Sequence, residues 1–382
     1  MRIAIEAGTS WRNRAGTGIY VRNLFSAMEK VAPEHSYLYL AASAASTSAT
    51  LDVSERSKVQ RLMNGLGQMA WLQVSLPLQL RKSRASVFHA PAMIGPFWQP
   101  CPAVFTVLDL AIIRYPQAFD PLWRWYTLVA LQLALPRAEA VIAISESTRQ
   151  DVIRYIGLPS DRVRVIYCGY DKGFRPIEDR ELLAAVRLKF GLPERFILNV
   201  GTLEPRKNVP RLLEAFQRLK SEYGIPHKLV IVGERGWRYD DIFRHVQQSR
   251  LEQEVIFTGH VDADDLPALY CAAELLAFPS LYEGFGLPLL EAMACGCPIV
   301  TSTVSSLPEV VGNAALCVDP YDARALAEAM AVLLLQPEKR AALVDRGFER
   351  AKLFSWEHAA AETVEIYTQI ARDTARAGVE VK

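Results

Sequence analysis

Two glutamates eight residues apart flank a glycine-containing segment in the second half of the chain. The segment reads Glu283-Gly-Phe-Gly-Leu-Pro-Leu-Leu-Glu291. We expect a strand, a loop and then a helix from about Gly286, because Pro288 suits the first turn of a helix. The N–H groups near Gly286, Leu287 and Leu289 could then hold a phosphate, and Glu291 could accept hydrogen bonds from two adjacent ribose hydroxyls. The alternative is an ordinary capped helix with a surface glutamate at each end.

Two adjacent cations follow a glycine turn in a second segment, Val200-Gly-Thr-Leu-Glu-Pro-Arg-Lys-Asn208. This segment also joins a predicted strand to a predicted helix. Arg206 and Lys207 could neutralise a diphosphate leaving group without a metal ion. The alternative is a pair of solvated basic side chains.

A third glycine pair, Gly16 and Gly18, follows the first predicted strand. Glycines let a backbone approach a ligand closely, although an ordinary tight turn explains the same pattern. The segment lacks the full dinucleotide-binding fingerprint and an acidic residue that closes the second strand. An NAD-dependent dehydrogenase is therefore disfavoured.

Short β-branched runs alternate with amphipathic stretches along the whole chain, which predicts parallel sheets with helices on both faces. We expect strands at Arg2–Glu6, Tyr37–Ala41, Ser86–His89, Ala103–Val107, Ala140–Ile144, Val163–Tyr167, Phe196–Gly201, Lys228–Gly233, Val255–Thr258, Leu275–Phe278 and Pro298–Thr301. Helices are expected at Val209–Tyr223, Asp265–Ala273 and Arg324–Leu335, with a last amphipathic helix from Glu357. Two series of strands indicate two doubly wound domains, separated within CGYDKGFRPIED (168–179).

Composition excludes several classes of protein. The 382 residues suit two domains, and 51% hydrophobic with 22% charged residues is typical of a globular chain. A net charge of +1 argues against a nucleic-acid partner. The six cysteines have no zinc-site spacing, and no apolar run reaches the ~20 residues that span a bilayer. The N-terminus MRIAIEAGTS lacks the features of a secretory signal, so we expect a cytoplasmic protein.

Together these segments resemble glycosyltransferase family 4, retaining enzymes with the GT-B fold of two facing Rossmann-like domains. The resemblance covers essentially the whole chain, and its motifs are GTGIY (16–20), ISESTRQDVIRYIG (144–157), VIYCGYDKGFRP (165–176), VGTLEPRKN (200–208), FTGHV (257–261), PSLYEGFGLPLLEAMACGCPIV (279–300) and FSWEHAA (354–360). It implies an acceptor-binding domain over 1–172, joined by a C-terminal helix at 357–382 that crosses back to it, and a nucleotide-sugar-binding domain over 173–356.

The resemblance also implies roles for individual residues. Arg206 and Lys207 match the cations that hold the donor diphosphate and stabilise it as it leaves. Glu283 matches the glutamate beside the transferred sugar, where it supports developing positive charge. Thr202 stands where some members carry a further arginine, so this chain would depend more on Arg206.

The remaining donor contacts are implied in the same way. Glu291 matches the ribose-binding glutamate. The backbone around Val261 matches the segment that contacts the base. Gly16 and Gly18 match the loop that closes over the phosphates. The glycine loop and helix start complete the donor site with Gly284, Phe285, Gly286 and Leu287.

One position departs from the family pattern. Many members read His-Asp-Leu after the fourth strand, whereas this chain reads Leu108-Asp109-Leu110. Leucine cannot transfer a proton, although in such enzymes the leaving phosphate is thought to accept the acceptor proton. Asp109 could orient a hydroxyl, or simply cap the strand end. His89 could reach the same place, or be an ordinary core histidine.

We therefore expect hexosyl transfer with retained configuration to a saccharide or lipid-linked saccharide in surface glycan assembly. GDP-mannose is the first donor to test, with UDP- and dTDP-sugars open, and neither a metal nor another cofactor is expected. Leu108 motivates an alternative, a catalytically impaired sensor or scaffold that binds a nucleotide sugar. A two-domain small-ligand binding protein is disfavoured by the cations.

A peripheral contact with the inner face of the cell membrane is a further expectation. Basic Arg81, Lys82 and Arg84 follow an apolar helix pattern, and an aromatic stretch at 121–128 contains Trp123, Trp125 and Tyr126. Aromatic rings beside arginine are typical of a lipid headgroup boundary. The alternative is that these rings line the core or the acceptor site.

Overall fold

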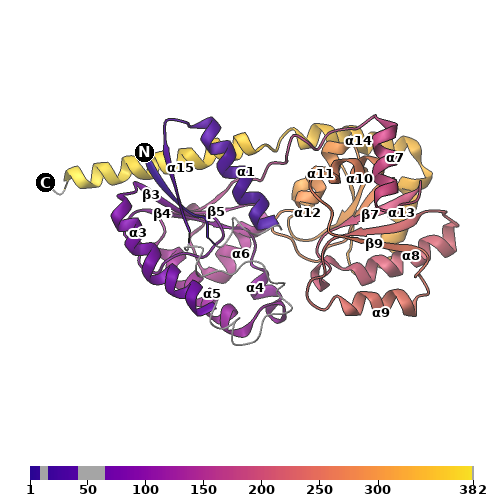
Figure 1. Ribbon diagram of the computed structural model, residues 1–382, viewed down its shortest axis with the longest axis horizontal. Helices are drawn as coiled ribbons and strands as arrows, with labels where there is room; N and C mark the ends of the chain where they lie inside the picture. Colours follow the sequence, from indigo (N-terminus) through magenta and orange to yellow (C-terminus); the bar gives the residue numbers. More distant parts are fainter. Residues whose placement is uncertain (9–15, 42–64, 381–382) are drawn as a thin grey trace. The chain divides into compact units, whose positions relative to one another are not determined.

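Each half of the chain is built around a parallel sheet of six strands (Figure 1). The computed structural model describes residues 1–8, 16–41 and 65–380. It divides into one unit of Met1–Cys168 with Trp356–Lys382 and a second unit of Gly169–Ser355. This division falls within the predicted linker 168–179, four residues before the expected boundary after residue 172. Cys168 is buried in the first unit, whereas Phe174 packs edge-on against Tyr270 of the second.

The sheet of the first unit has the strand order β2-β1-β3-β4-β5-β6. Its strands are β1 Arg2–Glu6, β2 Ser36–Leu40, β3 Val87–Ala90, β4 Ala103–Val107, β5 Ala140–Ala143 and β6 Val163–Val165. β3 and β4 are buried along their whole length, as expected for central parallel strands that are covered on both faces.

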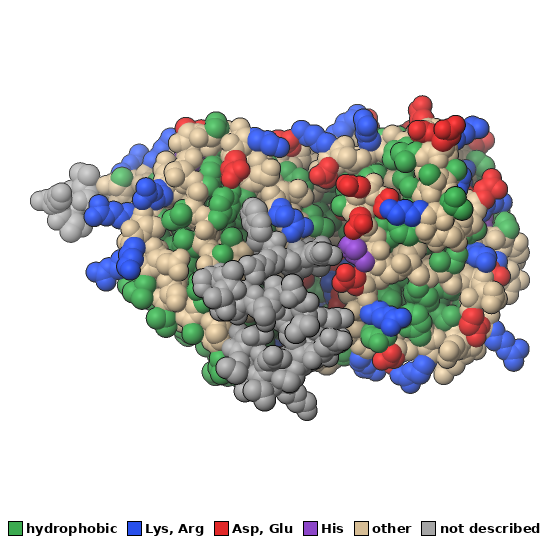
Figure 2. All heavy atoms as spheres, viewed as in Figure 1, with side chains coloured by type: hydrophobic (Ala, Val, Ile, Leu, Met, Phe, Trp, Pro, Cys, Tyr) green, Lys and Arg blue, Asp and Glu red, His purple; other side chains and the backbone are tan. Residues whose placement is uncertain are grey.

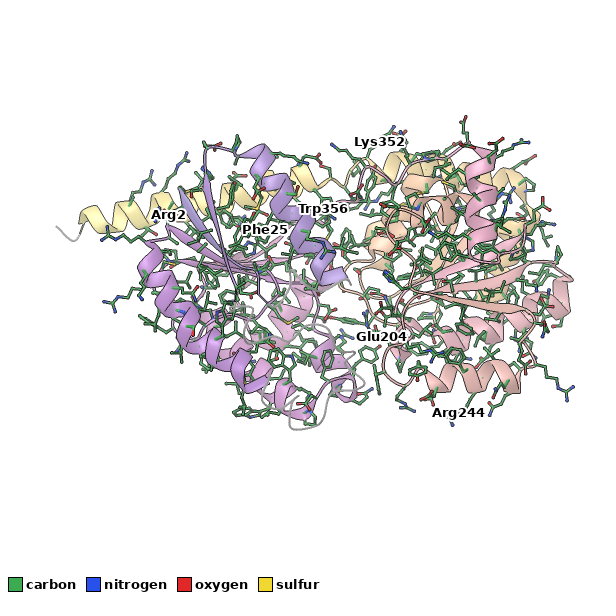
Figure 3. The ribbon with its side chains drawn as sticks, viewed as in Figure 1. Arg2, Phe25, Glu204, Arg244, Lys352 and Trp356 are labelled. Atoms are coloured by element: carbon green, nitrogen blue, oxygen red, sulfur yellow. The ribbon has the colours of Figure 1, made fainter. Side chains whose placement is uncertain are left out.

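The helical segments of the first unit cover this sheet. They are α1 Gly16–Val31, the π-helix η3 Trp71–Ser75, α3 Leu76–Ser83, α4 Ala111–Arg114, η4 Pro116–Ala118, α5 Pro121–Ala134, η5 Leu135–Arg137, α6 Glu146–Ile156, η6 Ser160–Arg162 and α15 Trp356–Glu380. The last of these, α15, returns to the first unit as predicted and packs along α1. Trp356, at the start of α15 (Figure 3), meets Tyr20 edge-on at 5.7 Å between ring centroids, and both are buried.

The sheet of the second unit has the order β12-β11-β10-β7-β8-β9. Its strands are β7 Phe196–Val200, β8 Lys228–Val232, β9 Val255–Gly259, β10 Leu275–Phe278, β11 Ile299–Ser302 and β12 Leu316–Val318. In both sheets the predicted strands are present, with their ends shifted by at most two residues. β12 was not predicted, because three half-buried residues at a sheet edge leave too short an apolar pattern.

Helices again lie on this sheet. They are α7 Arg180–Lys189, η7 Pro205–Lys207, α8 Val209–Tyr223, α9 Asp240–Gln248, α10 Leu266–Ala272, α11 Leu287–Cys295, α12 Leu307–Val311, α13 Ala323–Leu335 and α14 Pro337–Ala351. α8 and α13 contribute Leu212, Phe216, Leu326 and Met330 to one core with the apolar side chains of the strands.

On the face drawn in Figure 2, basic and acidic side chains of the described residues are interspersed.

Strand order determines where a ligand site can form. In the second unit the chain runs from β7 outward to β9, and then from β10 outward to β12. β7 and β10 are therefore neighbours whose following loops diverge to opposite sides. Such a switch point leaves a crevice beyond the carboxyl ends of the strands.

Candidate functional site

The two predicted chemical segments leave the carboxyl ends of β7 and β10, at the switch point of the second sheet. Hydrogen bonds join them: the Leu281 N–H donates to the Arg206 carbonyl at 2.8 Å. The Asn208 side chain donates to the carbonyls of Pro279 at 3.0 Å and Pro320 at 2.7 Å. The loop after β7 is thus attached to the loops after β10 and β12.

Glycines allow the backbones at this edge to approach closely. Gly201 has a φ of +151°, and a Cβ there would lie 3.2 Å from the Cε of Lys207. A Cβ on Gly233, after β8, would lie 2.1 Å from the Gly201 carbonyl oxygen. A side chain at Gly233 would push the Gly201 backbone out of place, and one at Gly201 would press against the Lys207 side chain.

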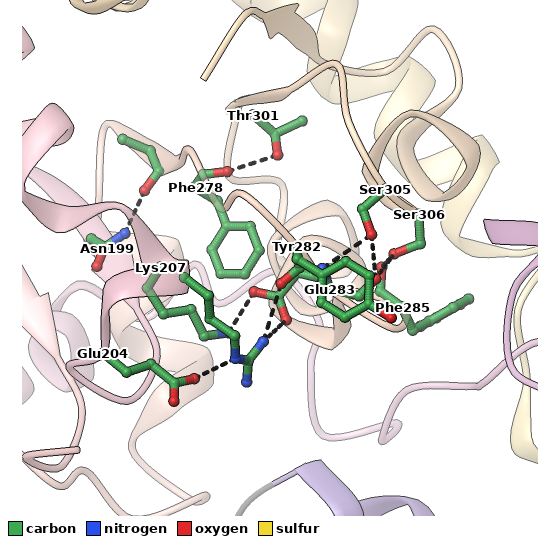
Figure 4. A network of polar contacts seen from close by, with 12 residues as sticks. Asn199, Glu204, Lys207, Phe278, Tyr282, Glu283, Phe285, Thr301, Ser305 and Ser306 are labelled. Carbon is green, nitrogen blue, oxygen red and sulfur yellow. Dashed lines mark hydrogen bonds and ion pairs between the residues drawn. The ribbon is translucent and has the colours of Figure 1, made fainter. Parts of the chain in front are cut away.

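Arg206, Lys207 and Glu283 form one ionic cluster (Figure 4). The Arg206 Nη1 lies 2.8 Å from the Glu283 Oε2, and the Lys207 Nζ lies 2.6 Å from the Glu283 Oε1. On its other side, the Arg206 Nε lies 2.5 Å from the Glu204 Oε1. The sequence did not single out Glu204, because a glutamate in a loop gives no signal until its partner is known.

Burial and the neighbouring charges shift the pKa values of the residues in this cluster. Glu283 is 7% exposed, and burial alone would raise its pKa, but Lys207 and Arg206 outweigh burial and lower the pKa to about 2. Burial also lowers the pKa of Lys207, against the opposing effect of Glu283. Its ammonium group lies 5.1 Å from the centre of the Phe278 ring. The predicted alternative of solvated basic side chains is wrong for Lys207, whose side chain is 11% exposed.

Two serines that the sequence did not indicate fix the backbone of Glu283 (Figure 4). The Ser305 hydroxyl donates to the Glu283 carbonyl at 2.6 Å and accepts from the Glu283 N–H at 3.1 Å. The Ser306 hydroxyl contacts the carbonyls of Glu283 at 3.0 Å and Phe285 at 2.7 Å. Ser305 has a φ of +59°, a left-handed conformation that costs energy outside glycine.

The glycine loop enters α11 near the residue predicted. Gly286 has a φ of +112° and stands directly before the helix, with Pro288 in its first turn. Phe285 is buried and packs edge-on against Phe354 at 5.8 Å, which anchors the loop that contains Gly284. Leu287 is the first helical residue.

Glu291 lies on the buried side of α11. It is 8% exposed, and the Tyr270 hydroxyl donates to its Oε2 at 2.8 Å. Burial raises the pKa of Glu291 to about 7; the Tyr270 hydrogen bond lowers the pKa, and the charge of Asp171 raises it further. The alternative of two surface glutamates at the ends of a capped helix is wrong, because Glu283 and Glu291 are both buried.

The other donor positions in this unit surround the same sheet edge. Val261 is buried just beyond β9, and Thr202 is half-buried just beyond β7. The Gly233 N–H donates to the Gly259 carbonyl at 2.9 Å, so the loops after β8 and β9 are joined as well. No group of three His, Cys, Asp or Glu side chains suited to a metal ion occurs among the described residues of either unit.

In the first unit, the predicted glycine loop begins a helix. Gly16 is the first residue of α1, and Gly18 is buried in its first turn. The interpretation of these two glycines as turn residues is therefore wrong. The rest of the predicted loop includes Ala15, which lies outside the described residues.

Near the end of β4, the structure decides between the alternatives for His89, while the predicted role of Asp109 stays a prediction. The Asp109 Oδ1 accepts from the Ala111 N–H at 2.9 Å, a local hydrogen bond just before α4. His89 is fully buried, with Nδ1 2.5 Å from the Tyr367 hydroxyl and Nε2 2.8 Å from the Thr106 hydroxyl. Burial lowers its pKa to about 3. His89 is thus a core histidine, and Leu108 beside Asp109 is itself buried.

Comparison with protein families gives two matches that follow the two halves of the chain. Residues 14–174 match the model described as Glycosyltransferase Family 4, and residues 185–350 match the model described as Glycosyl transferases group 1.

Individual proteins agree with these matches. The O-antigen chain mannosyltransferase B of Escherichia coli is 35% identical over 289 residues, which are 75% of each chain. The sucrose-phosphate synthase of Thermosynechococcus elongatus superposes with a TM-score of 0.76 at 25% identity, over 97% of this chain and 98% of that one. Anabaena HepE, solved in complex with UDP-glucose, superposes with a TM-score of 0.71 at 20% identity, over 98% and 100% of the two chains.

Proposed function

Because the chain belongs to glycosyltransferase family 4 and has its GT-B fold, we propose that it is a retaining hexosyltransferase that uses a nucleotide-sugar donor. GDP-mannose is the first donor to test, since the similar O-antigen enzyme is named a mannosyltransferase. The acceptor is a saccharide or a lipid-linked saccharide of a surface glycan. In this proposal the second unit binds the donor and the first unit the acceptor.

The observation that carries the proposal is the contact of Arg206 and Lys207 with Glu283 at the switch point of the second sheet. Two cations held there can neutralise a donor diphosphate as the sugar–phosphate bond breaks. Donor binding would exchange their contacts with Glu283 for contacts with phosphate oxygens. The Glu283 carboxylate, ionised at neutral pH because its pKa is about 2, would then face the sugar and stabilise its developing positive charge.

Glu291 would bind the ribose of the donor. Its carboxylate already accepts one hydrogen bond, from Tyr270, and a carboxylate has about four acceptor positions. The remaining positions suit the two adjacent hydroxyls of a ribose.

A panel of intact GDP-, UDP- and dTDP-sugars tests the donor. A donor at 100 times its dissociation constant adds about 2.7 kcal/mol to the free energy of unfolding, a readily measured thermal shift. Product formation from that donor, with the anomeric configuration assigned by NMR, then tests transfer and retention. Binding without transfer or hydrolysis would favour the sensor or scaffold alternative, and an inverted product would refute the retaining assignment.

We also propose that the first unit contacts a membrane surface. Among the described residues no helix is both long and apolar enough to cross a bilayer. The first unit exposes large apolar side chains at Val74, Leu78, Trp98, Leu122, Trp125 and Leu133. Tyr126 is buried and bonded to Gln73 at 2.7 Å, and Trp123 stacks on Tyr126. Of the three predicted aromatic residues, the interface would therefore use Trp125.

Sedimentation with vesicles tests this contact. Binding should require anionic lipid, weaken as salt rises and fall when Arg81, Lys82 and Arg84 become Ser, because each basic residue near an anionic leaflet contributes about 1 kcal/mol. Trp125→Ser should weaken it too, whereas Trp237→Ser, a matched change in the second unit, should not. Protein that stays in the supernatant at low salt would refute the membrane contact and favour a soluble acceptor.

A further inference from the structure

Glu204 lies next to the ionic cluster of the second unit (Figures 3 and 4), in a loop that hydrogen bonds of Leu203 join to the loop after β8. The Leu203 N–H donates to the Glu234 carbonyl at 2.9 Å, and the Gly236 N–H donates to the Leu203 carbonyl at 3.1 Å. The Glu204 carbonyl accepts from the Lys207 N–H at 3.0 Å. Its extended backbone, with a φ of −145° and a ψ of 156°, is the conformation favoured before a proline.

The side chain of Glu204 is not explained by a local structural role. Glu204 precedes the 3-10 turn η7, yet its side chain makes no capping hydrogen bond to that turn. Instead its Oε1 lies 2.5 Å from the Arg206 Nε, and the Glu204 side chain is 16% exposed. A mostly buried glutamate whose carboxylate contacts a guanidinium of the ionic cluster points to a role in the site.

Two carboxylates thereby hold the Arg206 guanidinium at two different nitrogens. Glu204 contacts Nε and Glu283 contacts Nη1, while Nη1 also donates to the Tyr282 carbonyl at 3.2 Å. Contacts at two nitrogens fix both the plane and the direction of the planar guanidinium group. In the mechanism proposed above, Glu283 releases Arg206 when the donor arrives, while Glu204 still holds the Arg206 Nε.

We propose that Glu204 is a positioning residue that keeps the Arg206 guanidinium aimed at the donor diphosphate through bond cleavage. The inference rests on the proposed role of Arg206. The two cations and the two carboxylates of the cluster sum to zero net charge, so Glu204 restrains the ground-state attraction for phosphate. Loss of Glu204 should therefore lower turnover without weakening nucleotide binding, which loss of a purely structural residue would not do.

The test measures nucleoside diphosphate release from GDP-mannose, UDP-glucose and dTDP-glucose, using the donor that wild-type protein turns over. Glu204→Ala should lower kcat about tenfold or more, since misplacement of a catalytic group by about 1 Å can cost a hundredfold. It should not weaken binding of the free nucleoside diphosphate, measured by calorimetry. Glu204→Gln keeps an acceptor for the Arg206 Nε–H but removes the charge. It should lose less turnover than Glu204→Ala and bind the nucleoside diphosphate more tightly.

A double-mutant cycle with Arg206→Ala decides whether Glu204 acts through Arg206. In the Arg206→Ala background, Glu204→Ala should cost less than about twofold in kcat. Glu214→Ala is the matched control, because Glu214 forms a comparable 2.5 Å ion pair with Arg211 on α8, and it should leave kcat unchanged. Thermal unfolding checks that each variant is folded; if Glu204→Ala unfolds, the cycle is run with Glu204→Gln.

The outcomes separate the two proposals. Equal losses from Glu204→Ala with and without Arg206, or weaker nucleotide binding by both Glu204 variants, would overturn the positioning role. Full turnover in Arg206→Ala would overturn the proposed role of Arg206 and this inference with it. No release by wild-type protein from any of the three donors would count against the proposed function itself.

Discussion

The buried carboxyl of Glu291 makes donor affinity dependent on pH near neutrality. Its pKa is raised to about 7, mainly by burial, so about a tenth of the protein carries the carboxylate at pH 6 and about nine tenths at pH 8. A ribose needs the charged, accepting form. If only that form binds well, the dissociation constant of an intact nucleotide sugar should be about tenfold weaker at pH 6 than at pH 8.

Substitutions of Glu291 test whether its carboxylate causes this pH dependence of donor affinity. Glu291→Ala removes a charge-assisted hydrogen bond worth about 1.5–3 kcal/mol, or roughly tenfold to 150-fold in affinity. Glu291→Gln should bind weakly with a flat pH profile. Tyr270→Phe removes the hydrogen bond to the carboxylate, which should raise the pKa and move the midpoint of the profile to higher pH.

Stability should respond in the opposite sense to binding. Because the pKa of Glu291 is raised in the folded state, its favourable contribution is complete below about pH 4.5 and is lost as pH rises through about 7. Glu291→Gln should therefore make the donor-free protein more stable at pH 8, by up to about 3 kcal/mol, while it weakens donor binding. Urea unfolding at pH 5 and pH 8 measures this effect and shows that the variant is folded.

Titration calorimetry with an intact nucleotide sugar is the appropriate assay, because its diphosphate stays ionised throughout this range. Buffers of different ionisation enthalpy should reveal proton release on binding at pH 6 to 7. Unchanged nucleotide affinity in Glu291→Ala, or the same pH profile in wild-type protein and Glu291→Gln, would refute the ribose assignment.

Three further predictions concern the ionic cluster. Lys207→Ala and Arg206→Ala should lower kcat more than ground-state binding, because negative charge on the diphosphate grows as the bond breaks; normal turnover in folded variants would show that the roles are wrong. EDTA should leave activity intact, and a loss that magnesium restores would contradict metal-independent transfer. The pKa of Glu283 is lowered to about 2, so its contribution to stability, about 3 kcal/mol, is present above about pH 4.5 and lost toward pH 2. Urea midpoints between pH 2.5 and 5 should depend less steeply on pH in Glu283→Gln, and equal slopes would refute this assignment.

Local sequence patterns determined the elements of this protein. The helix at Val209–Tyr223 and the strands at Arg2–Glu6, Ala103–Val107 and Leu275–Phe278 have the bounds predicted. Each of these segments has a clear apolar pattern and a residue that marks its end. Gly224, for example, ends the helix at Val209–Tyr223. Such signals act between near neighbours along the chain, so a single sequence reveals them.

Only the tertiary structure decided which side chains meet. Glu283 and Lys207 are 76 positions apart, and they touch because β7 and β10 are adjacent in the sheet. Strand order is a long-range property that periodicity does not encode. The same holds for the serines that fix Glu283, for the contact of Glu204 with Arg206, and for His89, which Tyr367 of the returning helix α15 holds in the core. Burial, which sets the pKa values of Glu283 and Glu291 in opposite directions, depends on neighbours from many segments and is therefore decided by the fold.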